Sequence, residues 1–352
     1  MEISPSMDVQ TKPGGRKIPP WLILALTYAI SIVSLAWALH GYDYSQIKGA
    51  ILSARWGWVA LAVVIELAVY VLHAWRWMTL LSPVERPGLW ETVQAIYIGL
   101  FASGVLPFRP GELIRGYLLA VWADIPISLT LTSMVIERVL DGIWVVLAFG
   151  VVSAWFVSMP RALVDAAQVL AVAVLVLAAV FFYVLFHRQH AHSFLSTRNW
   201  GRKFIHVLDQ IHHLGVWRTM AASFGITFLY WIAQILPVWA LFRSYDMDLS
   251  FKEATVVLVI KTIGTIIPIF PGNLGVFQFL VVFALKIFNV EQPVAQELSV
   301  LMWAALTLPL MIAGFVAVLF TGRSIAEIHH HAHAHHRRYM DRYHATEPNP
   351  KS

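Results

Sequence analysis

Long runs of apolar residues occupy most of the chain, and short polar stretches separate them. The runs lack the period-two alternation of membrane-barrel strands, so helices are favoured. A helix crosses the hydrocarbon core of a bilayer with about 20 apolar residues. The pattern therefore predicts an all-α polytopic membrane protein with about six full transmembrane helices. The runs of sufficient length cover residues 21–39, 57–81, 130–157, 163–186, 219–242 and 296–320.

Two further apolar regions, residues 88–121 and 252–288, are interrupted at their centres by proline and glycine. Proline removes a backbone donor and clashes with the preceding turn, whereas glycine permits a bend. A broken backbone at membrane depth persists only where it is buried in protein or lines a cavity. Each region is therefore predicted to be a hairpin of two half-helices. The alternative is an ordinary pair of kinked helices.

Lysine and arginine are concentrated in three segments, residues 1–20, 187–218 and 321–352. The positive-inside rule places these segments, and with them both termini, in the cytoplasm. When the spans are counted between them, each interrupted region returns to the side from which it enters. Region 88–121 is then a re-entrant hairpin from the cytoplasmic side, and region 252–288 is one from the opposite side.

The interrupted regions also share a short sequence. Pro107–Leu113 and Pro268–Leu274 both read P-x-x-P-G-x-L and align without a gap at an offset of 161 residues (268 − 107). Equivalent hairpins that enter from opposite sides are typical of inverted-repeat transporters. The sequence therefore predicts a transmembrane domain over residues 21–320, with repeat halves near 57–186 and 219–320.

Composition supports the membrane assignment, because 59% of the residues are hydrophobic and 13% are charged, against about 25% charged in soluble domains. The sequence has no cysteine, which excludes disulfides and thiolate metal sites. The net charge of +5 resides in loops and tails, where basic residues meet lipid head groups, so no nucleic-acid partner is expected. No P-loop, H-E-x-x-H or G-x-S-x-G motif is present. We expect neither an enzyme nor a bound cofactor.

The tips of the two hairpins offer groups that bind anions. Proline suits the first turn of a helix, so Pro110 and Pro271 are expected to start half-helices near the membrane midplane. The free N–H groups and positive dipole ends of opposed half-helices attract phosphate, and Arg109 adds a full charge. The predicted site residues at the tips are Arg109, Pro110, Gly111, Pro271, Gly272 and Asn273.

Charged residues also lie inside predicted helices. Glu112 and Arg115 are three residues apart and share a helix face, and Glu137, Arg138 and Asp141 lie within an apolar helix. A charge at the bilayer centre costs about 2.5–3.5 kcal/mol on insertion scales, so such residues face partners or a wet cavity. Two roles stay open for these five residues: a mutually neutralising structural network, or contact with substrate.

Two basic residues and a histidine-rich tail each allow two interpretations. Arg76 either extends to the lipid head groups or belongs to the site, and Lys261 either attracts anions or extends likewise. Imidazoles in the tail can ligate Zn²⁺, Ni²⁺ or Cu²⁺. Because no carboxylate or cysteine fixes a geometry there, a solvated tail is preferred and no metal site is predicted. The imidazoles belong to His329, His330, His331, His333, His335 and His336.

The stretches "LPFRPGELIRGYLL", "ERVLDG" and "PGNLGVFQ" resemble the lysylphosphatidylglycerol synthase transmembrane, or flippase-like, family over roughly residues 20–320. Arg76-Trp77 fits the second helix of that family. In the second half, Asn273 stands where glycine is usual and Gln278 where glutamate is usual. The resemblance implies a domain that moves anionic or aminoacylated lipids between leaflets, and it adds Gln278 to the site. The aminoacyl-transferase domain of the large members is not predicted here.

These observations favour a lipid flippase that binds the phosphate of its substrate at the opposed half-helix N-termini. The alternative is a non-transporting scaffold or accessory subunit for a lipid synthase or glycosyltransferase. The expected ligands are membrane lipids, namely an anionic phospholipid, an aminoacylated lipid or a lipid-linked sugar. A partner synthase and a homo-oligomer both stay open. The expected location is a bacterial or archaeal cytoplasmic membrane.

Overall fold

The computed structural model describes residues 54–106, 109–155, 161–186, 216–265 and 271–321, together with a few positions between 29 and 40. The predictions for the first helix, for most of the basic loop and for the histidine-rich tail lie outside these residues. So do the first prolines of both repeated motifs, Pro107 and Pro268.

All regular elements of the described residues are helical, which confirms the all-α prediction. Three of the described helices are long and apolar enough to cross a membrane: Trp56–Leu81, Gln292–Phe320 and Trp217–Ser244, the last being α10 without its first residue. The described elements are α3 (Trp56–Leu81), α4 (Leu89–Val105), α5 (Gly111–Trp122), α6 (Ile127–Trp155), α7 (Arg161–Phe186), α10 (Val216–Ser244), α11 (Phe251–Gly264), the short 3-10 helix η2 (Pro271–Asn273), α12 (Val276–Ile287) and α13 (Gln292–Phe320).

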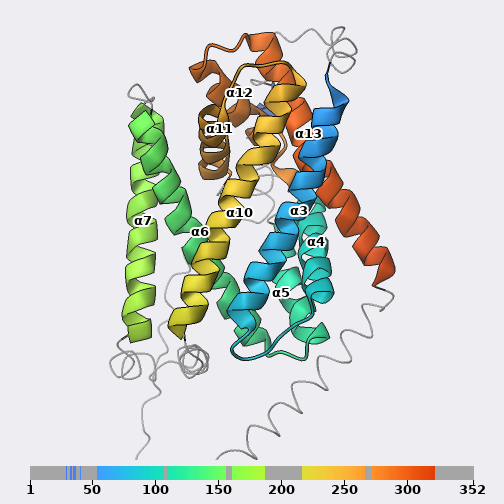
Figure 1. The fold of residues 1–352 in the computed structure, drawn as a ribbon, viewed down its shortest axis with the longest axis vertical. Coiled ribbons are helices and arrows are strands. Elements are labelled where there is room, and N and C mark those ends of the chain that lie inside the picture. The colour runs from blue at the N-terminus through green and yellow to red at the C-terminus, as the bar shows by residue number, and fades with distance from the viewer. Residues whose placement is uncertain are drawn as a thin grey trace, which may run out of the picture.

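Each interrupted region forms two short helices that pack against each other, α4 with α5 and α11 with α12 (Figure 1). The α4–α5 hairpin lies in the lower half of the bundle in Figure 1, and the α11–α12 hairpin lies at its upper end. The broken helices are thus as predicted. That each hairpin re-enters the bilayer, and from which side, stays a prediction.

The helices of the second half repeat those of the first half in order and length. α3 and α10 start 160 residues apart (216 − 56), and α4 and α11 start 162 apart (251 − 89). After the breaks the offset becomes 165, both for α5 and α12 (276 − 111) and for α6 and α13 (292 − 127). α3 and α10 run antiparallel against each other, and the backbone N–H of Arg55 donates to the Ser244 carbonyl at 2.8 Å. This arrangement fits the predicted inverted repeat.

The longer offset after the breaks has a local cause. It also shows that Pro271 does not start the second half-helix, contrary to the prediction. Pro110 directly precedes α5 and has helical dihedrals (φ −66°, ψ −8°). Pro271 instead starts the three residues of η2, in which Gly272 and Asn273 have φ values of 62° and 54°. Two consecutive residues with positive φ cannot continue an α-helix. α12 therefore begins only at Val276.

Each hairpin has its own hydrophobic core, and α3 contributes to both. Buried side chains of α10 to α13, such as Phe242 and Leu285, pack with the first half of α3. Buried side chains of α4 to α6, such as Leu119, pack with Trp77 in its second half. α7 packs only against α6 among its principal contacts and lies at the periphery, where Val169 and Leu175 are exposed (Figure 1). Outward apolar side chains of this kind suit a lipid environment.

Glycine allows α4 to approach its neighbours closely, as small residues do between membrane helices. A Cβ added at Gly99 would lie 2.7 Å from the carbonyl oxygen of Gly111 in α5. A Cβ added at Gly111 would overlap the carbonyl oxygen of Gly99. On another face of α4, a Cβ at Gly314 of α13 would overlap the carbonyl oxygen of Tyr97. These contacts involve backbone atoms, which cannot rotate away.

Gly111→Ala is predicted to destabilise the α4–α5 hairpin, because overpacking costs about 1–3 kcal/mol. The midpoint of thermal unfolding in detergent should fall by several degrees. Gly225→Ala is the matched control, since its Cβ would meet no atom within 4 Å. Alanine at a helical glycine is expected to be neutral or to stabilise by up to about 1 kcal/mol. Equal unfolding midpoints for both variants would contradict the close approach.

Single cysteines test whether the hairpins re-enter, because the chain contains no other cysteine. Glu85→Cys and Ile127→Cys flank α4–α5 at exposed positions, and Asp248→Cys and Glu291→Cys flank α11–α12 likewise. In sealed vesicles, a membrane-impermeant maleimide should label the first pair from one side and the second pair from the other. Labelling of Glu85→Cys and Ile127→Cys from opposite sides would rule out the re-entrant arrangement.

Candidate substrate-binding cavity

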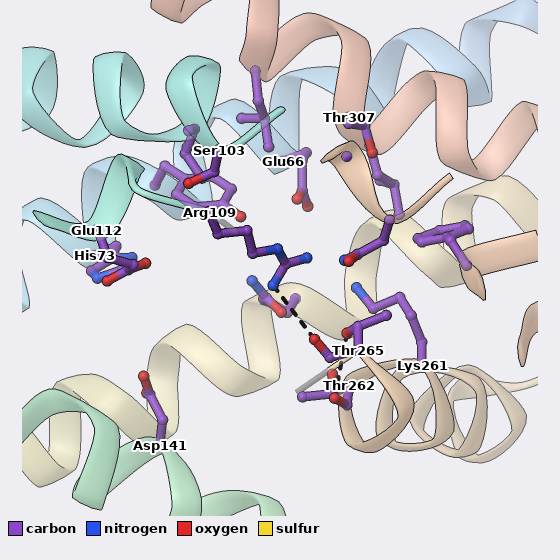
Figure 2. Close-up of a pocket in the computed structure, with 18 of the residues that line it drawn as sticks. Glu66, His73, Ser103, Arg109, Glu112, Asp141, Lys261, Thr262, Thr265 and Thr307 are labelled. Atoms are coloured by element: carbon purple, nitrogen blue, oxygen red, sulfur yellow. Dashed lines mark hydrogen bonds between the residues drawn. The ribbon is translucent and has the colours of Figure 1, made fainter. Parts of the chain in front are cut away.

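A cavity of about 680 Å³ lies at the centre of the bundle, and all nine described α-helices line it. Residues of both breaks reach it, namely Arg109 from the first and Gly272 and Asn273 from the second. Figure 2 shows polar side chains from several helices directed into this space. It is called the central cavity below.

The two hairpins meet at this cavity. Arg109 Nη1 donates to the carbonyl oxygen of Thr265 at 3.4 Å, directly after the C-terminus of α11 (Figure 2). A cation is favoured at a helix C-terminus, where the dipole is negative. Trp303 Nε1 of α13 donates to the carbonyl oxygen of Gly272 at 2.8 Å and so holds the second break. The Arg109 side chain of the first hairpin thus contacts the C-terminal end of α11 in the second hairpin.

Arg109 has an unusual backbone conformation, with φ of 47°. Residues other than glycine rarely adopt positive φ, and such strained positions concentrate at functional sites. Asn273, at the second break, has φ of 54° and also lines the central cavity. Both breaks therefore present a residue with positive φ to the same space.

Positions that the repeat makes equivalent line the cavity together. Before the breaks, at an offset of 161, the lining pairs are Tyr70 and Trp231, His73 and Gln234, Leu100 and Lys261, and Gly104 and Thr265. After the breaks, at an offset of 165, they are Glu112 and Phe277, Asp141 and Leu306, Gly142 and Thr307, and Val145 and Leu310. The cavity thus lies between the two halves. Its charged positions differ between the halves.

Three acidic or basic side chains in the cavity have no direct counter-ion among the described residues: Glu66, Arg109 and Lys261. Glu66 of α3 is only 7% exposed. Lys261 of α11 places Nζ 5.9 Å from the ring centroid of Phe277, a distance at which the ring face attracts a cation. Glu66 and Lys261 interact electrostatically without forming an ion pair. Together the three groups carry a charge of +1 when all are ionised.

Six other charged residues form an ion-pair network at the cavity, and three of them line it. The network is closed by Arg138 Nη1, which lies 3.8 Å from Asp141 Oδ2. Arg115 Nη2 of α5 lies 2.8 Å from Glu112 Oε2 and 2.9 Å from Glu137 Oε2. Arg76 of α3 binds Asp141 and also Glu137, the latter at 3.2 Å. Three guanidinium groups balance three carboxylates. The members of the network are Arg76, Arg115, Arg138, Glu112, Glu137 and Asp141.

Burial divides this network into a core and a rim. Arg76 and Glu137 are fully buried, and His73 Nε2 lies 3.2 Å from Glu137 Oε1. Arg138 and Glu112, at 3.3 Å, are 52% and 45% exposed. The core joins α3, α5 and α6, and therefore fixes the helix that follows the first break. These ion pairs match one of the two roles left open by the sequence, the mutually neutralising structural network.

The structure separates the predicted site residues into two groups. Those that line the cavity are Arg109, Glu112, Arg138, Asp141, Gly272 and Asn273, whereas Pro110, Gly111, Arg76, Arg115, Glu137 and Gln278 do not line it. Pro271 is the first residue of η2. Contact of either group with substrate stays a prediction. Arg76 is buried, so the interpretation that it extends to lipid head groups is wrong. Lys261 lines the cavity instead of extending outward.

Gln278 has a local role at the start of α12. Its Oε1 accepts the backbone N–H of Gly275 at 2.7 Å, and the side chain is buried. One N–H group at this helix start is therefore already bonded. The half-helix N-termini contribute Glu112 and Phe277 to the cavity lining. The positive charge that faces the cavity thus comes from side chains such as Arg109 and Lys261.

Sequence reasoning missed Glu66, although a signal was present. It is the only acidic residue of α3, inside the apolar stretch "VVIELAVYV", and an ionisable residue within a membrane helix is a candidate functional group by default. Tyr70 and Tyr230 were also missed, because tyrosine is common in membrane helices and carries little information alone. No group of His, Asp or Glu among the described residues has a geometry that could hold a metal ion.

Glu137→Gln is predicted to destabilise the protein strongly, because it leaves Arg76 and Arg115 short of a buried carboxylate. Breaking a buried ion pair by removing one partner costs about 3–5 kcal/mol. Arg138→Gln is the control, because its half-exposed pair is worth at most about 1 kcal/mol. Thermal unfolding in detergent should separate the two variants clearly. Similar shifts in both would argue against a structural network.

Comparisons with known proteins agree with this architecture. The profile of the lysylphosphatidylglycerol synthase TM region matches residues 24–314. A UPF0104 membrane protein of Methanothermobacter thermautotrophicus is 22% identical, over 86% of this chain and 97% of its own length. Another, from Methanocaldococcus jannaschii, is 21% identical over 86% and 95%. No solved structure matches significantly. The chain therefore belongs to the family of the lysylphosphatidylglycerol synthase TM region.

Proposed function

We propose that this protein moves an anionic lipid between bilayer leaflets, with the phosphate of the head group bound between Arg109 and Lys261. The observation that carries the proposal is a pair of cations in the central cavity, one from each hairpin, that no described carboxylate neutralises by an ion pair. Every other arginine that lines the cavity or lies beside it is paired with a carboxylate. Two cations without an ion-pair partner in a half-buried site favour an anionic ligand.

The lining of the cavity suits an amphipathic ligand. Hydroxyl groups of Thr262 and Thr307 accompany the cations, while Leu100, Leu306 and Leu310 supply apolar surface. Binding sites of this kind combine a mostly apolar wall with a few placed polar groups. The lining also includes a residue of the peripheral helix α7, Val174. A lipid can place its phosphate near the cations and its acyl chains toward the membrane.

The contact between the hairpins supports transport rather than static binding. Arg109 holds the end of α11 through one long hydrogen bond to a neutral carbonyl. Hydrogen bonds between two ionised groups are roughly twice as strong as neutral ones, so a phosphate competes well for this guanidinium. Binding of the head group then replaces this direct contact with a bridge through the phosphate. Tilting of one repeat against the other around a fixed site is the usual mode of inverted-repeat transporters.

Arg109→Ala is predicted to slow lipid movement by about tenfold or more, because a hydrogen bond to a charged group contributes about 1.5–3 kcal/mol. The assay uses purified protein in liposomes that contain fluorescent phosphatidylglycerol, phosphatidic acid or phosphatidylcholine, with quenching of the outer leaflet. Arg109→Lys should retain part of the activity because it retains the charge. Arg86→Ala, at an exposed position before α4, is the control.

The outcomes separate transport from the accessory role. If wild type and Arg109→Ala move every lipid at the same rate, the anion site is refuted. If wild type binds anionic lipid in an Arg109-dependent manner but moves none, the lipid-presenting accessory subunit becomes the better description. Equal movement of phosphatidylcholine and phosphatidylglycerol would argue against selection by charge.

A further inference from the structure

Glu66 is a buried acid in the central cavity that no described residue neutralises by direct contact. Among the described residues it forms neither a hydrogen bond nor an ion pair, whereas Glu112, Glu137 and Asp141 each bind an arginine. It lies in the apolar part of α3 and is 7% exposed. A carboxylate in such a place either takes up a proton or depends on more distant cations.

The charged and titratable groups that face this space come from several elements. α13 lines the cavity with Leu306, Thr307, Leu310 and Met311 and contributes no titratable group to it. The facing groups are Lys261 of α11, Arg109 of the first break, Tyr70 and His73 of α3, Tyr230 of α10, and the network members Glu112, Arg138 and Asp141. Tyr97 of α4 lies outside the lining, and its hydroxyl donates to the carbonyl oxygen of Leu67. The arginines of the network are already paired with carboxylates. Arg109 and Lys261 are therefore the cations that Glu66 shares with an anion that enters the cavity.

An anion bound between Arg109 and Lys261 meets the negative charge of Glu66. Two anionic groups in one site repel each other, which makes the protonated form of either group more favourable. The phosphate of a lipid diester is a much stronger acid than a carboxylic acid. The proton therefore goes to Glu66.

We propose that Glu66 is a proton-binding site and that the cavity takes up one proton together with each anionic head group. This rests on the proposed function, since it concerns the same anion site. The empty site holds two cations and one carboxylate, a charge of +1 (2 − 1). The site loaded with a singly charged phosphate and a proton on Glu66 also carries +1 (2 − 1). Loading with a proton thus leaves the charge of the site unchanged.

The step balances without any other reactant. A proton from water bonds to a carboxylate oxygen of Glu66 as the phosphate binds, and the resulting O–H donates a hydrogen bond to a phosphate oxygen. On release the phosphate leaves, and the proton returns to water on that side. Each lipid is accompanied by one proton. By reciprocity, a lower pH tightens anion binding by the same factor by which the anion favours protonation.

The first experiment measures binding of short-chain phosphatidylglycerol to purified protein at several pH values. In wild type, the affinity should rise as pH falls, by up to about tenfold per pH unit for one linked proton. Glu66→Gln imitates the protonated acid, so its affinity should be high and independent of pH. Glu66→Asp keeps a carboxyl group and should keep the pH dependence. The high affinity expected of Glu66→Gln shows that this variant is folded. Glu85→Gln, at an exposed position, should behave as wild type.

The second experiment detects the proton itself. Liposomes with an internal pH indicator should report proton movement that depends on phosphatidylglycerol in wild type, and none in Glu66→Gln. Difference infrared spectra of the purified protein add a readout that needs no transport. Inorganic phosphate should produce the carbonyl stretch of a protonated carboxylic acid in wild type, and Glu66→Gln should lack it.

The outcomes keep the two proposals apart. Arg109-dependent lipid movement with no pH dependence, or with the wild-type pH dependence intact in Glu66→Gln, overturns the proton proposal and leaves the transport proposal standing. Absence of lipid movement in wild type overturns the transport proposal. In that case the infrared band of the protonated carboxylic acid tests the proton site independently. If phosphate does not produce this band in wild type, or if Glu66→Gln retains the band, Glu66 does not bind the proton.

Discussion

A charge in the interior of a membrane protein must be compensated by a partner, and this constraint organises the molecule. Three arginines and three carboxylates satisfy it among themselves and join α3, α5 and α6. Such a network adds little net stability over apolar packing, yet it is costly to break. It therefore fixes the position of the helix after the first break. The cavity groups Glu66, Arg109 and Lys261 lack this direct compensation, and there a ligand can supply it.

The backbone obeys a similar constraint at the two breaks, where helical hydrogen bonds are lost. The carbonyl of Thr265 accepts from Arg109, the carbonyl of Gly272 accepts from Trp303, and the N–H of Gly275 donates to Gln278. Polar backbone groups in the membrane are tolerated only with such partners or beside a cavity. The need for partners thus brings both breaks to the centre of the bundle. The same contacts make the cavity a junction between the hairpins.

Most of the fold could be predicted because length and apolarity of a run are local properties. Proline and glycine marked both breaks for the same reason. The exact start of α12 could not be predicted, since it depends on the conformation of Gly272 and Asn273. The burial of Arg76 depends on carboxylates 61 and 65 residues further along the chain. The approach of Glu66 to Lys261 is likewise tertiary, because it requires α3 and α11 to face one cavity.

The repeat is symmetric in its helices but asymmetric in its charges. At equivalent lining positions, Lys261 replaces Leu100, and Phe277 replaces Glu112. Arg109 belongs to the tip of the first hairpin, whereas the cation of the second hairpin lies one helix turn before its break. In the proposed site, an anion between these two cations contacts both hairpins at once. Any tilt that separates the hairpins also separates the cations, so the movement that opens the site weakens its hold on the anion.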